Sequence, residues 1–224
     1  MLKLALALAR KDLSLALRGA GLVQSILLGL LLVFMFSLSQ KTGSLASGQM
    51  AAAIFWLSSL FCQTLVFNML FAFEETQGAR TCLLLSPAPV TDIFLGKALA
   101  GFVLIFLAQI LFFPAIIVFL GQTVSQSWPM GLVMLFLTDT GLACLGALLG
   151  ALSQGQTARE SLLSLLVFPL LAPLLLAAIS VFAAVFGEQA GEDLTSWIGF
   201  SAAFDAIFLA IALLLFRFVY TGDD

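Results

Sequence analysis

The sequence predicts an all-α integral membrane protein with six membrane spans and an N-terminal interfacial helix. Hydrophobic residues make up 62% and charged residues 9% of the 224 residues, whereas a typical soluble domain is about 45–50% apolar and about 25% charged. The apolar runs recur evenly, and each is close to the ~20 residues that a helix needs to cross a bilayer. Since no stretch remains for a separate soluble fold, we expect one membrane domain over residues 1–224.

Residues 1–19 are expected to form an amphipathic helix on the membrane surface. Lys3, Arg10, Lys11 and Arg18 lie on one helical face, with leucine and alanine on the other, as in helices that bind the headgroup region. The alternative is the basic region of a cleaved signal peptide. The apolar run that follows is closer in length to a full span than to the 7–15 residue core of a signal peptide, so we expect a retained anchor.

The spans alternate with short polar loops, and the basic residues set their orientation. If both termini are cytoplasmic, Lys41 is the one basic residue outside, in agreement with the usual excess of Lys and Arg in cytoplasmic loops. We therefore expect a multi-pass membrane protein with both termini cytoplasmic. The expected spans are residues 20–38, 50–73, 98–120, 130–152, 162–186 and 197–219.

The stretch 74–97 is expected to be a cytoplasmic coupling loop, because a simple connection between spans could be much shorter. Residues 79–85 can form two helical turns with leucine anchors, and Thr91 or Asp92 could cap the next span. One interpretation is an interfacial helix that lies on lipid. The other is a helix that docks in a groove of a soluble partner, with Glu74, Glu75 and Arg80 at its rim. The predicted docking residues are Glu74, Glu75, Gly78, Arg80, Leu83, Leu84, Leu85, Ser86 and Pro87.

Two carboxylates, Asp139 and Asp205, fall near the middle of spans, where a charge costs several kcal/mol. They are candidates for a proton or cation relay, or for polar contacts between helices. Gly146 and Gly150 form a small-residue seam that allows close helix contact within the subunit or in a homodimer. Expected polar partners are Asn68, Gln63, Gln109, Thr138 and Thr140, and expected helix kinks lie at Pro169 and Pro173.

Several kinds of chemistry have no motif in this sequence. It contains no histidine and three scattered cysteines, so neither a metal site nor a histidine-based triad is expected. Gly96-Lys97 lacks the preceding glycine of a phosphate-binding loop. We expect a non-catalytic subunit without nucleic-acid binding, and any ATPase would be another chain.

Three segments resemble the heme exporter protein B (CcmB) family, within the wider group of six-span ABC-2-type export permeases. Pro169 and Pro173 belong to the second segment and Asp205 to the third, whereas Arg80 replaces an expected apolar residue and Asp139 is not a recognised family feature. The segments are FEETQGARTCLLLSPAPVTDIFLGKALAGF, RESLLSLLVFPLLAPLLLAA and AFDAIFLAIALLLFRFVYTGD.

This resemblance implies a permease subunit of an ABC complex in c-type cytochrome biogenesis. A cytoplasmic ATPase would bind ATP and Mg²⁺. The hydrolysis of ATP would drive heme delivery or release of the heme-loaded periplasmic chaperone. The implied partners are that ATPase, a heme-handling membrane subunit and a small single-span subunit, and the complex rather than this chain handles heme. The alternatives are an ABC-2-type permease for a lipid or drug, or an ion-coupled carrier that uses Asp139 and Asp205.

Overall fold

The computed structural model describes residues 2–40, 46–76, 78, 83, 85, 89–153, 157–187 and 193–221. Within them the ordered elements are helices, and no strand is present, which confirms the all-α class. The helices are α1 (Leu2–Arg18), α2 (Ala20–Ser39), α3 (Gly48–Thr76), α5 (Val90–Leu120), α6 (Trp128–Ser153), α7 (Thr157–Val185) and α8 (Leu194–Thr221).

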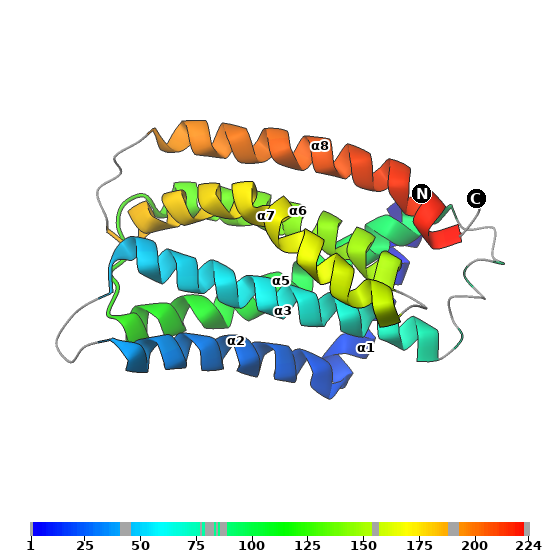
Figure 1. The fold of residues 1–224 in the computed structure, drawn as a ribbon, viewed down its shortest axis with the longest axis horizontal. Coiled ribbons are helices and arrows are strands. Elements are labelled where there is room, and N and C mark those ends of the chain that lie inside the picture. Colours follow the sequence, from blue (N-terminus) through cyan, green and yellow to red (C-terminus); the bar gives the residue numbers. More distant parts are fainter. Residues whose placement is uncertain are drawn as a thin grey trace.

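The six longer helices run side by side in a bundle, and α1 lies at one end (Figure 1). Among the described residues, α2, α3, α5, α6 and α8 are long and apolar enough to cross a membrane, and α7 contributes a shorter apolar stretch, Leu170–Val185. The predicted count of six spans is therefore not matched in full. The first and the last described residues lie at the same end of the bundle (Figure 1).

Helix α1 packs on the bundle through a face of small residues. Ala5, Ala9 and Ala16 are buried on this face, and Asp12 lies among them with 4% exposure. At Gly96 of α5, an added Cβ would lie 3.0 Å from the Ala5 carbonyl oxygen, so the two backbones approach closely. We expected the apolar face of this helix to meet lipid, but its alanines contact protein.

Helix α5 begins at Val90, earlier than the expected start of a span at residue 98. Its N-cap is Pro89, which offers no side-chain hydrogen bond, so the predicted capping role of Thr91 or Asp92 is wrong. Asp92 lies instead in the first turn, where a carboxylate favours the partial positive charge of the helix N-terminus. This earlier start brings Lys97 inside the helix.

The glycine seam of α6 receives aromatic rings from α3 of the same chain. Gly146 packs against Phe67 and Gly150 against Phe71, so closely that a Cβ at either glycine would overlap the ring. The seam therefore serves contact within the subunit, one of the two expected uses. The backbone of α7 is helical through Pro169 and Pro173, and their role as kinks stays a prediction.

Candidate functional site

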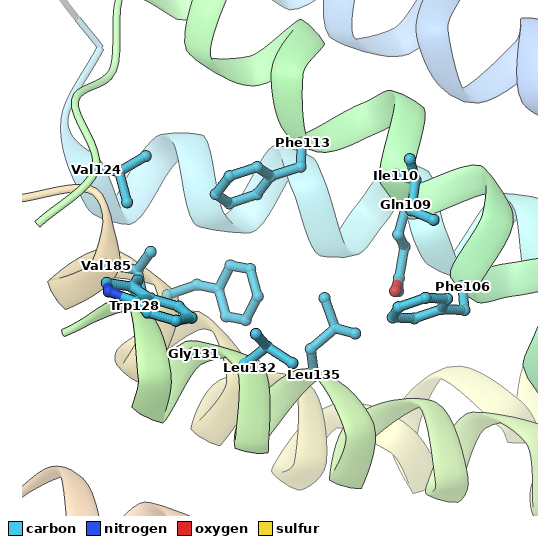
Figure 2. Close-up of a pocket in the computed structure, with 11 residues that line it drawn as sticks. Phe106, Gln109, Ile110, Phe113, Val124, Trp128, Gly131, Leu132, Leu135 and Val185 are labelled. Atoms are coloured by element: carbon cyan, nitrogen blue, oxygen red, sulfur yellow. The ribbon is translucent and has the colours of Figure 1, made fainter. Parts of the chain in front are cut away.

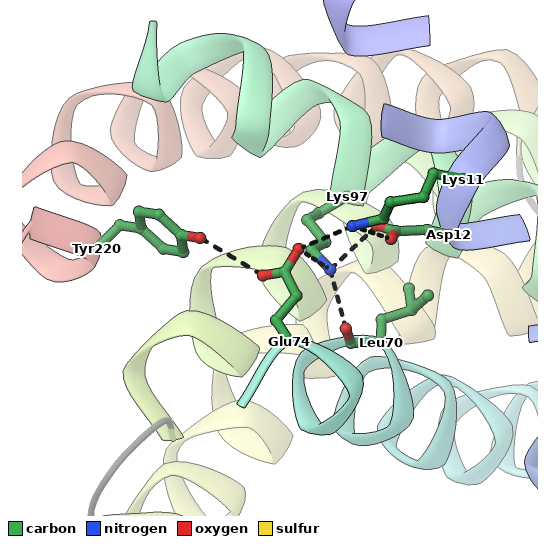
Figure 3. A network of polar contacts seen from close by, with 6 residues as sticks. All are labelled: Lys11, Asp12, Leu70, Glu74, Lys97 and Tyr220. Carbon is green, nitrogen blue, oxygen red and sulfur yellow. Dashed lines mark hydrogen bonds and ion pairs between the residues drawn. The ribbon is translucent and has the colours of Figure 1, made fainter. Parts of the chain in front are cut away.

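Five polar side chains from four helices meet at the end of the bundle that holds both termini (Figure 3). Helix α1 supplies two of them, and α3, α5 and α8 supply one each. We refer to this group as the charge cluster. Its members are Lys11, Asp12, Glu74, Lys97 and Tyr220.

Lys97 is the centre of the charge cluster. Its Nζ lies 2.8 Å from Glu74 Oε1 and 3.0 Å from Asp12 Oδ2, and it donates a hydrogen bond of 2.9 Å to the Leu70 carbonyl. The Asp12 oxygen makes an ion pair without the angle of a hydrogen bond. The Lys97 side chain is 2% exposed, and the Phe71 ring lies 5.1 Å from its ammonium group.

Lys11 and Tyr220 complete the charge cluster from two sides. Lys11 Nζ lies 3.0 Å from Asp12 Oδ1 and 3.4 Å from Glu74 Oε1. Burial lowers the pKa of Lys11, but the charges and hydrogen bonds of Asp12 and Glu74 outweigh it and raise the pKa above its ordinary 10.5. The Tyr220 hydroxyl donates to Glu74 Oε2 at 3.4 Å, and its buried ring stacks on Phe216.

The charge cluster is electrically balanced, with two lysines against two carboxylates. Such balance is needed because desolvating a charge costs several kcal/mol, which is offset only when the partners are close and well placed. Removing one member would leave an uncompensated buried charge, so the four helix segments are held in one arrangement. We infer that these segments move together.

The charge cluster also joins the two flanks of the segment that was predicted to be a coupling loop. Glu74 lies near the end of α3 and Lys97 in the second turn of α5, so their contact closes the base of the segment between them. Of that segment, Gly78 has a positive φ of 64°, a conformation that glycine adopts without strain. Leu83 packs against the core, whereas Leu85 is 84% exposed.

The predicted docking residues are thus placed differently from one another. We expected Glu74 at an exposed rim, but its side chain is 3% exposed and is ion-paired inside the charge cluster. Docking on the other residues stays a prediction. The side chain of Glu75 and residues Arg80, Leu84, Ser86 and Pro87 lie outside the described residues.

Sequence reasoning missed the roles of Asp12, Lys97 and Tyr220. Asp12 could have been found, because it shares the spacing of Ala5, Ala9 and Ala16 and therefore lies on the same helical face. An acid on a face of small residues indicates a buried partner. No local pattern marks Tyr220, which meets Glu74 across 146 positions of the chain.

Two of the predicted intramembrane polar residues, Gln109 and Asp139, meet in a second group that is separate from the charge cluster. Asp139 is fully buried, and its Oδ1 accepts a hydrogen bond of 2.8 Å from Gln109 Nε2, as expected for polar contacts between helices. Gln109 Nε2 also lies 3.3 Å from Ser59 Oγ. Asn68 is exposed on α3, away from the buried face.

Asp205 of α8 lies against the backbone of α6. A Cβ at Gly141 would come within 2.6 Å of Asp205 Oδ1, so this glycine makes room for the carboxylate. Neither of its side-chain oxygens has a hydrogen-bond partner among the described residues. Within the same residues, no group of three or more potential ligands could hold a metal ion.

Comparison with known proteins gives two consistent results. Residues 3–218 match the protein family described as CcmB protein. A relative from Haemophilus influenzae, heme exporter protein B, is 31% identical over 163 residues, which cover 72% of this chain and 73% of the relative. The similarity therefore extends over most of both chains.

Proposed function

The chain belongs to the CcmB protein family, and from this membership we propose that it is the permease subunit of an ABC-type exporter in c-type cytochrome biogenesis. The family match covers residues 3–218, and the Haemophilus influenzae relative is called a heme exporter protein. The five long apolar helices fit a multi-pass subunit of the bacterial inner membrane. In this proposal the chain is not an enzyme, and a separate subunit hydrolyses ATP.

The observation that carries the mechanism is the contact between Glu74 and Lys97 at 2.8 Å. The ATPase docks on the segment between these residues, where the exposed Leu85 offers an apolar anchor of the kind that fills a groove on a partner. A displacement of this segment reaches α3 and α5 through the two residues that flank it. The charge cluster transmits this displacement to α1 through Asp12 and to α8 through Tyr220.

Coupling in this proposal requires two arrangements of the bundle. A partner shifts such an equilibrium only by the difference in its affinity for the two states. The nucleotide-bound ATPase therefore favours one position of the coupling segment, and hydrolysis of ATP allows the segment to go back to the other position. The cargo is heme, or the periplasmic chaperone that carries it, and the heme-handling and single-span subunits of the same complex deliver and receive it.

The proposal places both termini and the charge cluster on the cytoplasmic side. The described chain ends lie at the same end of the bundle as the charge cluster (Figures 1 and 3). Helix α1, which contains Arg10, Lys11 and Arg18, lies at that end as well (Figure 1). This arrangement agrees with the excess of basic residues in cytoplasmic segments.

Co-purification tests this function. The tagged chain is extracted from native membranes in mild detergent, the recovered proteins are identified by mass spectrometry, and ATPase activity is measured. We expect a P-loop ATPase together with heme-handling membrane subunits. Recovery of the ATPase alone would favour a permease for a lipid or drug, and recovery of the chain by itself would reject the ABC assignment.

A matched pair of variants tests the docking surface. Leu85→Glu places a charge on the exposed anchor and should abolish recovery of the ATPase while the protein inserts at normal levels. Lys3→Glu changes the charge at another exposed position of the same end and should leave recovery of the ATPase unchanged. Equal recovery of the ATPase with both variants would contradict docking at Leu85, even if the complex itself exists.

A further inference from the structure

A cavity of about 420 Å³ lies between α5, α6 and α7, far from the charge cluster. This volume falls in the range of about 300–1,000 Å³ that is typical of small-molecule sites. Twelve residues separate Lys97 from Gln109 at its inner end, or about 18 Å of helix. Figure 2 shows the cavity running from Val124 and Trp128 to Gln109 and Phe106.

The lining is apolar except for the amide of Gln109 and the indole N–H of Trp128. Four aromatic rings contribute, and no charged residue lines the cavity. An ionised headgroup inside it would therefore have no counter-charge. The aromatic residues are Phe106, Phe113, Trp128 and Phe182.

Gln109 supplies one unused hydrogen-bond acceptor. The residue is 2% exposed, and its Oε1 has no partner among the described residues. Its Nε2 is committed to Asp139 and Ser59, which fixes the orientation of the amide. In Figure 2 the side chain enters the cavity beside Phe106 and Leu135. Leaving a buried acceptor unpaired costs about 1–3 kcal/mol, so a ligand that donates to it gains that energy.

We propose that this cavity binds a neutral apolar molecule with an aromatic hydroxyl head, which donates its hydroxyl to Gln109 Oε1 and packs its ring among the phenylalanines. Offset or edge contacts between aromatic rings add to the energy of apolar burial. The single hydrogen-bond donor of such a ligand matches the single acceptor at Gln109. Its lack of charge matches the uncharged lining. This site does not depend on the ATPase or on the proposed function.

The ligand reaches this cavity from the lipid phase. Ile110, Leu132 and Trp128 line it and are 53%, 43% and 55% exposed, on helices that are long and apolar enough to span the membrane. The apolar body of the ligand can extend past these residues into lipid. The hydroxyl then lies at the deep end of the cavity, next to Gln109.

The test compares a brominated alkylphenol with its methyl ether, which lacks the donor. Bromine quenches nearby tryptophan fluorescence, and Trp128 lines the cavity. The whole protein is titrated in lipid nanodiscs. We expect saturable quenching by the phenol that is smaller in Trp128→Phe, where Trp56 beside Phe182 is the remaining nearby tryptophan. Binding of the ether should be about fivefold weaker, in line with the loss of one hydrogen bond.

Three variants locate the contact. Gln109→Leu should weaken phenol binding to the level of the ether and leave ether binding unchanged. Leu135→Phe fills the inner end of the cavity and should abolish binding of both. Leu111→Phe, on an exposed position of the same helix α5 that does not line the cavity, should keep the affinities of the unaltered protein.

Some outcomes would overturn the proposal. Quenching that rises without saturation, or that is equally strong in Trp128→Phe, would mean that the probe only dissolves in lipid. Equal affinities for phenol and ether would reject the hydrogen bond to Gln109. If Gln109→Leu does not fold, Leu135→Phe decides the location, because unchanged binding in that variant excludes this cavity.

Discussion

Lys97 Nζ and Glu74 Oε1 lie 2.8 Å apart in the bundle, although their positions flank the segment that we expect to contact the ATPase. Both residues are 2% exposed. The contact therefore fixes the distance between the end of α3 and the start of α5, whatever the conformation of the segment between them. A force on that segment is transmitted to these two helices.

Lys97→Met should destabilise the protein by about 3–5 kcal/mol, because it leaves Asp12 and Glu74 buried with less positive charge. The free energy of unfolding is measured by denaturant titration in mild detergent. Lys3→Met, at an exposed position, is the control and should change stability by less than about 0.5 kcal/mol.

A double-mutant cycle isolates the Glu74 contact from other effects of Lys97. Glu74→Gln together with Lys97→Met should cost less than the sum of the single changes, with a coupling of about 0.5–3 kcal/mol. Additive costs would show that the ion pair contributes nothing of its own, and the charge cluster could then not act as a rigid connection.

The contact between α1 and α5 can be tested with two alanine substitutions of opposite expected sign. At Gly96 an added Cβ would lie 2.9 Å from Leu8 Cβ and 3.0 Å from the Ala5 carbonyl oxygen. Gly96→Ala should thus displace α1 and cost about 1–3 kcal/mol. Gly199 of α8 has no atom within 4 Å of such a Cβ, so Gly199→Ala should stabilise by about 0.5–1 kcal/mol.

Unfolding of the two glycine variants in the same detergent gives the comparison. The Asp12–Lys97 pair joins the same two helices, so Gly96→Ala should also reduce the coupling between Asp12 and Lys97 in a double-mutant cycle. A neutral Gly96→Ala would mean that α1 is free to leave α5, as the expected surface helix would be.

The raised pKa of Lys11 predicts that the folding stability of the protein depends on pH in the alkaline range. Its folded-state pKa is raised above the ordinary 10.5 by Asp12 and Glu74, against the opposing effect of burial. A raised pKa means that the contribution of Lys11 to folding is fully present below pH 10.5 and is lost as the pH rises through the folded-state pKa. The stability difference between the protein and Lys11→Gln should therefore stay constant from pH 6 to about 9.5 and shrink above 10.5. A difference that already shrinks near pH 8 would contradict the ion pairs of Lys11.

The helical class could be predicted from the sequence, because apolar runs are local signals. The start of α5 could not, since Val90–Leu95 continues the helix beyond the length that a span needs. Glu74 was expected at an exposed rim because a carboxylate in a polar stretch is normally solvated. Its burial depends on Lys97 and Tyr220, which lie 23 and 146 positions away along the chain.

The polar contacts within the spans could likewise be predicted only in part. Gln109 was expected as a partner of Asp139, since both are polar residues within spans, and the structure joins them. Which partner Asp139 takes could not be deduced, because Asn68 is equally polar yet exposed. Helix rotation decides between them, and it is set by contacts such as Phe67 against Gly146.

Asparagine variants of Asp139 and Asp205 separate an ATP-driven permease from an ion-coupled carrier. Asp139→Asn keeps an oxygen that accepts the Gln109 hydrogen bond, and Asp205→Asn keeps the shape that fits against Gly141. If these acids are polar contacts between helices, both variants should support cytochrome c maturation at close to the unaltered level, measured by heme staining of the mature cytochrome. Asp139→Leu removes the acceptor and should cost about 1–3 kcal/mol of stability, because the Gln109 amide loses a buried partner.

A carrier needs the ionisable group itself. Loss of maturation in both asparagine variants at normal protein levels, with stability unchanged, would therefore contradict the structural role and favour transport of a proton or cation through Asp139 and Asp205.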